Sequence, residues 1–292
     1  MTTSDALPPA TTPSPVPAIT PPPRWSRYVA LGDSFTEGLW DLPSDADACR
    51  GWADLLAGHL ASRQDAAGAQ PLAYANLAVR GRLLRPILRE QVPAALALGP
   101  DLVSLVGGGN DLLRPTGDPD RLARDLEAAV VRFRRAGADV LLATGVDTAD
   151  SPLVRRTRSR VGVLNAHVWS IARRHGAAVV DLWGMRSLRD WRMWSDDRIH
   201  LTTEGHRRVA QAALVALGLS PDDPRWDEPL TALPAPPRVQ QLRDDAEWVH
   251  THVVPWMTRR FQHRSSGDAR VAKRPELTAA LDLPLVDVPT TE

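Results

Sequence analysis

The sequence predicts a three-layer α/β fold with a parallel sheet and right-handed crossovers. Five short apolar runs alternate along the chain with segments whose apolar residues recur at helical spacing. This alternation is typical of repeated strand–helix units. One run, 101–106, is apolar almost throughout, as expected for a strand that helices cover on both faces. With 292 residues, 43% of them hydrophobic, the chain suits one domain of roughly 200 residues with extensions.

The strands and helices are expected in regular alternation. Strands are expected at 28–31, 72–77, 101–106, 138–143 and 178–182. Helices are expected at 52–60, 83–98, 121–135, 154–175 and 203–214. Pro86 and Pro93 must interrupt or kink the second helix, because proline removes a helical hydrogen bond and its ring clashes with the preceding turn. The elements therefore make a five-stranded sheet.

Both ends of the chain differ in composition from this core. Residues 1–24 are rich in proline, serine and threonine and are expected to form a disordered tail, which leaves 25–219 as the core domain. Residues 220–292 are expected to form a proline-rich linker, an amphipathic helix and, from Arg264, a loose C-terminal tail. The helix would pack on the core or form a homo-oligomer contact. Its apolar stripe comprises Val239, Leu242, Ala246, Val249, Val253 and Trp256.

The composition excludes several classes of partner and site. The 35 basic residues balance 35 acidic ones, so no overall field recruits nucleic acid or an anionic membrane. Cys49 is the only cysteine, and His250 and His252 lack ligand partners at suitable spacing, so we expect no metal and no cofactor. The chain has neither a secretory signal nor about 18 consecutive apolar residues, so we expect a soluble, cytoplasmic protein without a membrane span.

Polar and glycine-rich sequences follow the expected strands at the edge where an open parallel sheet binds its ligands. Gly32 permits a tight turn that lifts the hydroxyl of Ser34 to the rim of the sheet. Four such loops can share a pocket, and Trp183, Trp191 and Trp194 either wall that pocket or pack in the core. The loops contain Gly32-Asp33-Ser34-Phe35, Asn76 to Gly81, Gly107-Gly108-Gly109-Asn110-Asp111, and Asp197-Arg198-Ile199-His200.

Ser34, His200 and Asp197 together suit nucleophilic catalysis. A serine hydroxyl is a poor nucleophile at neutral pH and needs an adjacent base, which an imidazole can be because its pKa lies near 6.5. Asp197 precedes His200 by three residues and can orient the ring, with Asp196 as the weaker alternative. These residue types predict a serine nucleophile with a histidine base.

Charge that develops on a substrate carbonyl oxygen needs fixed hydrogen-bond donors. The backbone amides of Ser34 and Gly81 and the side chain of Asn110 would supply three donors. Each residue also has a structural interpretation, because Ser34 suits a turn, Gly81 suits the end of a strand and Asn110 suits a helix cap. Their occurrence together favours an oxyanion hole.

Four motifs in this order resemble those of the SGNH hydrolase superfamily, the GDSL-type lipases and esterases. The motifs are Gly32-Asp33-Ser34, Asn76 with Gly81, Gly108-Gly109-Asn110-Asp111, and Asp197 through His200. The resemblance covers about 27–217 and implies a flavodoxin-like sheet and hydrolysis of a small-molecule carboxylic ester through an acyl-serine intermediate. Two alternatives stay open, an acyltransferase that uses the same serine and a noncatalytic binding module on the same fold.

Overall fold

The computed structural model describes residues 24–39, 49–149, 151, 154–234, 237–254, 265–268 and 270–281. The expected disordered tail, 1–24, lies outside these residues except for Arg24. The described residues contain a six-stranded sheet in the order β5-β4-β3-β1-β2-β6. Its strands are β1 (Arg27–Gly32), β2 (Ala73–Asn76), β3 (Leu102–Val106), β4 (Asp139–Ala143), β5 (Ala178–Val180) and β6 (Arg274–Ala279).

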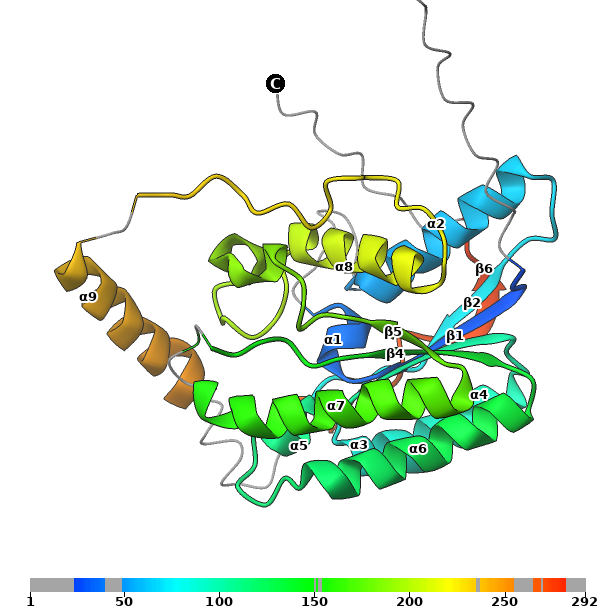
Figure 1. The fold of residues 1–292 in the computed structure, drawn as a ribbon, viewed down its shortest axis with the longest axis horizontal. Helices are drawn as coiled ribbons and strands as arrows, with labels where there is room; N and C mark the ends of the chain where they lie inside the picture. Colours follow the sequence, from blue (N-terminus) through cyan, green and yellow to red (C-terminus); the bar gives the residue numbers. More distant parts are fainter. Residues whose placement is uncertain are drawn as a thin grey trace, which may run out of the picture.

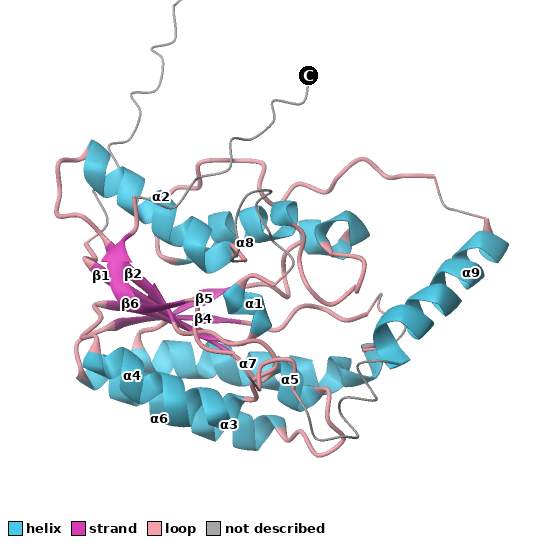
Figure 2. Ribbon diagram, turned by 180° about the vertical axis from the view of Figure 1, so that it is seen from behind, coloured by secondary structure: helices cyan, strands magenta, loops and turns pink. Residues whose placement is uncertain are grey.

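The first five strands are parallel, in the flavodoxin-like order. They confirm the predicted three-layer α/β class. Helices α2 (Trp52–Ala66) and α8 (Thr203–Ala216) cover one face, as Figure 1 shows. The opposite face is covered by α3 (Leu84–Pro86), α4 (Val92–Ala97), α6 (Pro119–Arg135) and α7 (Arg158–His175), which Figure 2 shows from behind.

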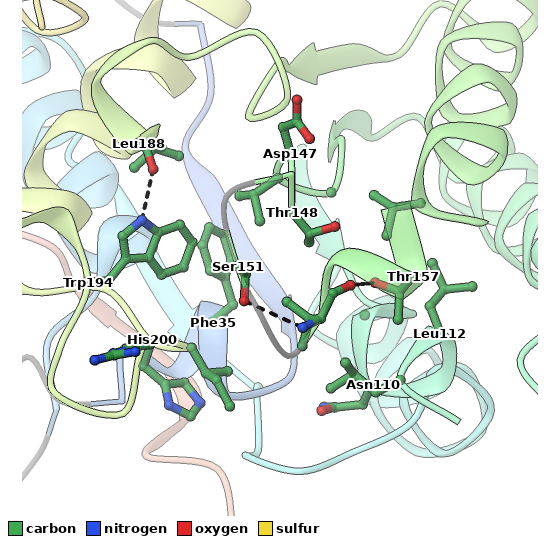
Figure 3. Close-up of a pocket in the computed structure, with 18 of the residues that line it drawn as sticks. Phe35, Asn110, Leu112, Asp147, Thr148, Ser151, Thr157, Leu188, Trp194 and His200 are labelled. Carbon is green, nitrogen blue, oxygen red and sulfur yellow. Dashed lines mark hydrogen bonds between the residues drawn. The ribbon is translucent and has the colours of Figure 1, made fainter. Parts of the chain in front are cut away.

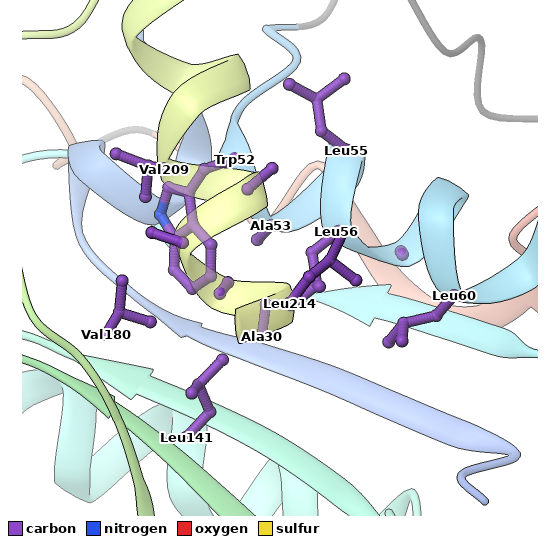
Figure 4. Close-up of a cluster of buried hydrophobic side chains, with 14 of the residues drawn as sticks. Ala30, Trp52, Ala53, Leu55, Leu56, Leu60, Leu141, Val180, Val209 and Leu214 are labelled. Atoms are coloured by element: carbon purple, nitrogen blue, oxygen red, sulfur yellow. The ribbon is translucent and has the colours of Figure 1, made fainter. Parts of the chain in front are cut away.

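Apolar side chains fill both spaces between the sheet and its helices. On the α2 and α8 side, Trp52 and Leu214 are fully buried against Ala30 of β1 and Leu141 of β4 (Figure 4). On the other side, Phe133 of α6 lies in the second buried cluster. Both faces of the central strands are therefore covered, which explains why their sequences are apolar almost throughout.

The expected helix at 83–98 is interrupted, as its prolines predict. After α3 the chain forms a π-helical segment, Ile87–Gln91, and then continues as α4 with Pro93 near its start. The buried side chain of Gln91 receives a hydrogen bond from the backbone N–H of Gly32 and donates one to the Gly32 carbonyl, both at 2.9 Å. The interrupted helix thereby holds the end of β1, directly before the Ser34 turn.

Two predictions were wrong near the C-terminus: the sheet has a sixth strand, and part of the expected loose tail from Arg264 forms that strand. Residues 274–279 form β6, which pairs antiparallel with β2 at the edge of the sheet, and Ala280 is fully buried. The segment contains Pro275 and two charged residues, and such a sequence is compatible with an edge strand but does not indicate one. Its pairing partner lies about two hundred residues earlier.

The expected amphipathic helix begins as α9 (Arg238–Trp248) and continues as a π-helical segment, Val249–Val253. Within its predicted stripe, Val239 and Val249 are exposed, and Trp256 lies outside the described residues. Arg198 contacts this helix through an ion pair with Asp245 at 2.6 Å. The homo-oligomer contact stays a prediction.

Among the described helices, none has the length and apolarity that a membrane span requires.

Candidate active site

The four motif loops lie beyond the carboxyl ends of the strands. One-turn helices follow two neighbouring strands there, α1 (Ser34–Glu37) after β1 and α5 (Gly109–Leu112) after β3. The chain leaves β1 toward β2 on one side and returns to β3 on the other, so these two strand ends flank the switch point of the sheet. A crevice at this point is where open α/β sheets bind ligands.

Ser34 is the first residue of α1, in a turn that leaves no room for extra side chains. A Cβ on Gly32 would lie 2.5 Å from Thr36 Oγ1 and 2.6 Å from the Val106 carbonyl oxygen, so only glycine fits there. Asp33 caps α1, since its Oδ1 accepts a hydrogen bond from the Phe35 amide at 3.1 Å. Burial raises the pKa of Asp33 to about 6.

The structure brings Ser34, His200 and Asp197 into one hydrogen-bonded row. His200 Nε2 lies 2.9 Å from Ser34 Oγ, and His200 Nδ1 lies 2.6 Å from Asp197 Oδ2. Asp196, the weaker alternative, is exposed and Asp197 occupies the position beside the ring. With Nδ1–H donated to Asp197, the lone pair of Nε2 faces the serine hydroxyl.

The loop that carries His200 and Asp197 is fixed by local hydrogen bonds. An isolated bridge between Trp194 and Leu201 closes the loop, and Asp197 Oδ1 accepts hydrogen bonds from the amides of Ile199 and His200 at 2.9 and 3.0 Å. Burial alone would raise the pKa of Asp197, but the hydrogen bond and charge of His200, with these amides, hold it well below its usual value. Asp197 therefore stays ionised at neutral pH.

Asn110 and Gly81 take different positions relative to the pocket. Asn110 lines it, and its Nδ2 donates hydrogen bonds to Asp33 Oδ2 and to the Arg82 carbonyl, both at 3.1 Å. Gly81, at φ +72°, lies against Ser265 of the C-terminal segment, and the described residues that line the pocket do not include it. Among the described contacts, none joins Gly81 to Ser34. The role of the Gly81 amide in the oxyanion hole therefore stays a prediction.

Asn76, from the second motif, supports α1 from below. It is fully buried, and its Nδ2 donates hydrogen bonds to the Thr36 carbonyl and to the Tyr74 hydroxyl, both at 3.0 Å. Its Oδ1 accepts a hydrogen bond from the Ala78 amide. The second motif thus connects the end of β2 to the helix that carries Ser34.

A pocket of about 230 Å³ opens beside Ser34 and His200. Figure 3 shows Trp194 and Phe35 on the side of His200, and Leu112 and Asn110 opposite. Trp191 also lines the pocket, whereas Trp183 lies outside the lining and packs under the Arg158 guanidinium. The other apolar side chains of the lining are Leu113, Val146, Val154, Val161, Leu188 and Ile199.

The charged groups of the pocket are paired with one another or with neighbours. Asp147 receives hydrogen bonds from Arg158 at 2.6 and 3.0 Å and lies 3.5 Å from Arg189. Arg198 pairs with Asp245 and lies over the ring of Trp248, 5.0 Å from its centroid. Arg158 and Arg189 thus share one carboxylate, and apart from these charged groups the lining is mainly apolar. The described residues also contain no group of three or more His, Cys, Asp or Glu side chains placed to hold a metal ion.

A cluster of charged side chains lies behind α1, and no sequence motif indicates it. Glu37, the last residue of α1, accepts hydrogen bonds from the backbone and guanidinium of Arg80 at 2.5 to 3.1 Å. Lys273 lies beside it and binds Asp54 at 2.6 Å. The one available signal was that Lys273 is the only lysine in the chain.

Comparison with known proteins decides the family of this fold and site. The family model of GDSL-like lipases and acylhydrolases matches residues 30–208, which is more than half of the chain. This chain belongs to the GDSL-like lipase/acylhydrolase family. The predicted resemblance is confirmed, and the protein is a hydrolase of the esterase type. No curated protein is significantly similar in sequence.

Solved structures of several GDSL-type and related hydrolases have the same fold. An α/β hydrolase, LAE5, from the metagenome of Lake Arreo, Spain, is 25% identical with a TM-score of 0.55, over 66% of this chain and 95% of its own. A putative GDSL-like lipase from Parabacteroides merdae is 19% identical with a TM-score of 0.56, over 67% and 96%. The acetylxylan esterase Axe2 from Geobacillus stearothermophilus is 20% identical with a TM-score of 0.55, over 67% and 95%.

Proposed function

We propose that this GDSL-like protein hydrolyses carboxylic esters through an acyl-serine intermediate, with Ser34 as nucleophile, His200 as base and Asp197 as the group that orients His200. The observation that carries the proposal is the continuous row from Ser34 Oγ through His200 to Asp197, at 2.9 and 2.6 Å. These are the separations at which a proton passes between a nucleophile and its base. The row opens on the pocket, where a substrate carbonyl can reach Ser34.

Acylation begins when Ser34 Oγ attacks the carbonyl carbon and its proton moves to His200 Nε2. Asp197 stays ionised and stabilises the imidazolium through the Nδ1–H hydrogen bond. The tetrahedral intermediate then collapses, the carbon–oxygen bond to the alcohol breaks, and His200 returns its proton to the leaving oxygen. The acyl group is left on Ser34 as an ester.

Deacylation repeats the same steps with water. His200 removes a proton from a water molecule that attacks the acyl carbonyl, and the proton then passes to Ser34 Oγ as that oxygen leaves. In both steps the amides of Ser34 and Gly81 and the Nδ2 group of Asn110 are the proposed donors to the oxyanion. Asn110 must release its hydrogen bond to Asp33 or Arg82 to take this part.

The pocket favours an uncharged substrate with an apolar acyl or alcohol group. Its lining surface is mainly apolar. Arg198 pairs with Asp245, and Arg189 lies 3.5 Å from Asp147, so both arginines have an acidic neighbour. A pocket of about 230 Å³ with a mainly apolar lining leaves room for an acyl chain longer than acetyl. We therefore expect hydrolysis of p-nitrophenyl esters to rise from acetate through butyrate to octanoate and to fall for chains that exceed the pocket.

The decisive experiment compares the wild type with Ser34→Ala on p-nitrophenyl acetate, butyrate and octanoate, with and without EDTA. We expect activity in the wild type, unaffected by EDTA, a loss of more than about 1,000-fold in Ser34→Ala, and labelling of Ser34 alone by a fluorophosphonate probe. Activity that survives Ser34→Ala would refute the nucleophile. Ester-exchange products with added alcohol would favour the acyltransferase, and absence of both turnover and labelling would favour the noncatalytic module.

A further inference from the structure

We infer that Lys273, in the C-terminal segment of the chain, is a positioning residue that holds the nucleophile helix α1 in place. The inference rests on the proposed function, because it assigns Lys273 a role through Ser34. Lys273 does not line the pocket described above, so it acts through contacts behind the site.

Helix α1 depends on its surroundings for its position. It has only four residues, and a single turn has almost no stability of its own because nucleation of a helix is unfavourable. The position of Ser34 therefore depends on what holds both ends of this turn, and Gln91 and Asp33 hold only its start. Two side chains hold its far end through the last carbonyls: buried Asn76 donates to the Thr36 carbonyl at 3.0 Å, and Lys273 donates to the Glu37 carbonyl at 2.5 Å.

The ammonium group of Lys273 has a complete set of partners. Besides the Glu37 carbonyl, Nζ donates to the Cys49 carbonyl at 2.7 Å and to Asp54 Oδ2 at 2.6 Å, which uses all three N–H donors. The side chain is 13% exposed and that of Asp54 is 3% exposed. Lys273 thus ties the end of α1 to the start of α2.

The choice of lysine is informative because the chain otherwise uses arginine. Lys273 is the single lysine among 35 basic Lys and Arg residues. Two carbonyls and a carboxylate converge on one point here, which suits a compact ammonium with three rotatable donors. A planar guanidinium presents its donors in a rigid fork and cannot direct three N–H groups from a single nitrogen to three acceptors.

The same segment also packs on the loop that carries Gly81. A Cβ on Gly81 would lie 2.2 Å from Ser265 Oγ, and a Cβ on Gly267 would lie 2.0 Å from the Arg80 carbonyl oxygen. Arg80 in turn binds the Glu37 carboxylate through its backbone N–H at 2.6 Å. Lys273 therefore braces the nucleophile helix, and Ser265 and Gly267 pack against the loop of the proposed oxyanion donor.

The test replaces Lys273 in the full-length chain. Lys273→Met removes all three hydrogen bonds, whereas Lys273→Arg keeps a positive charge beside buried Asp54 and is the variant more certain to fold, since an uncompensated buried charge is strongly destabilising. Arg270→Met is the matched control, because Arg270 lies in the same segment with an exposed side chain. Each variant is measured for p-nitrophenyl butyrate hydrolysis, for the rate of fluorophosphonate labelling and for Tm.

We expect kcat to fall about 100-fold in Lys273→Met and at least about 10-fold in Lys273→Arg, because a misplacement of about 1 Å costs a rate factor of this size. KM should stay within about twofold, since Lys273 lies outside the pocket lining, and the labelling rate of Ser34 should fall with kcat. Arg270→Met should match the wild type in all three measurements.

Two results would overturn the inference, and they differ from each other. If the wild type is active and labelled while folded Lys273→Arg keeps the wild-type kcat and labelling rate, even at a lower Tm, then Lys273 is merely structural and the proposed function stands. If the wild type is neither active nor labelled, the proposed function fails and the positioning role fails with it.

Discussion

Replacement of Asp197 by asparagine tests where the proton of His200 resides. In the native site, His200 Nδ1 donates to Asp197 Oδ2 at 2.6 Å, which leaves Nε2 free to accept the proton of Ser34, 2.9 Å away. In Asp197→Asn, the new side-chain amide would turn its N–H₂ group toward Nδ1, since its remaining oxygen still has two backbone amides to accept. Nδ1 would then be the acceptor, and Nε2 would carry the proton and donate to the serine.

The expected cost follows from the loss of the base. With Nε2 protonated, His200 cannot remove the serine proton, and a wrong tautomer of this kind lowers kcat by about 10⁴-fold, or about 5 kcal/mol. The fold should change little, because asparagine has the size of aspartate and keeps the loop acceptor. Steady-state hydrolysis of p-nitrophenyl butyrate at pH 7, with CD and Tm for the fold, measures the effect.

The neighbouring acid supplies a matched control for this substitution. Asp196 is exposed and adjacent in sequence, so Asp196→Asn changes the net charge equally without touching the ring of His200. We expect Asp196→Asn to retain activity within about twofold. Retention of activity within about tenfold by Asp197→Asn, or an equal loss in both variants, would refute the reasoning.

Two further predictions concern the stability of the turn around Ser34. Burial raises the pKa of Asp33 from 3.8 to about 6, so between these values the native state keeps a proton that the unfolded chain releases, and stability falls as pH rises. Asp33→Asn should therefore gain about 2 kcal/mol relative to the wild type between pH 4 and pH 7 in urea titrations; a difference that is constant with pH would contradict this. Thr36 Oγ1 is buried without a hydrogen-bond partner among the described residues, so Thr36→Val should raise stability by about 1 kcal/mol, whereas Thr157→Val, which loses a 2.7 Å bond to the Val154 carbonyl, should lower it. Equal Tm changes in the two valine variants would count against this account.

The sequence was sufficient to predict the parallel part of the fold because each strand and helix carries its own local pattern. The run 101–106 is apolar since β3 is covered on both faces, and the prolines at 86 and 93 fall where the second helix is interrupted. Ser34 and His200 could be proposed as partners because a serine nucleophile needs a base, because both lie in the four motifs, and because loops beyond the carboxyl ends of parallel strands share one edge. Their hydrogen bond spans a sequence separation of 166 residues.

The unpredicted features depend on contacts that have no local pattern. The segment 274–279 has no strong strand propensity, and it becomes β6 only because β2 presents an unpaired edge. The contacts of Lys273 with Glu37 and Cys49 go to backbone carbonyls, which any residue provides. Sequence therefore cannot indicate such partners, although the isolated lysine in an arginine-rich chain marked the position.

The position of β6 at the edge of the sheet has a consequence for biosynthesis. Helix α1 leaves the ribosome early, whereas its contact at Lys273 lies 236 residues later in the chain. Until residue 279 has been made, β2 lacks its outer neighbour and the end of α1 lacks its ammonium partner. On the positioning role inferred for Lys273, nascent and prematurely terminated chains would carry the serine, histidine and aspartate but remain poor esterases, so the emergence of β6 would time the onset of activity.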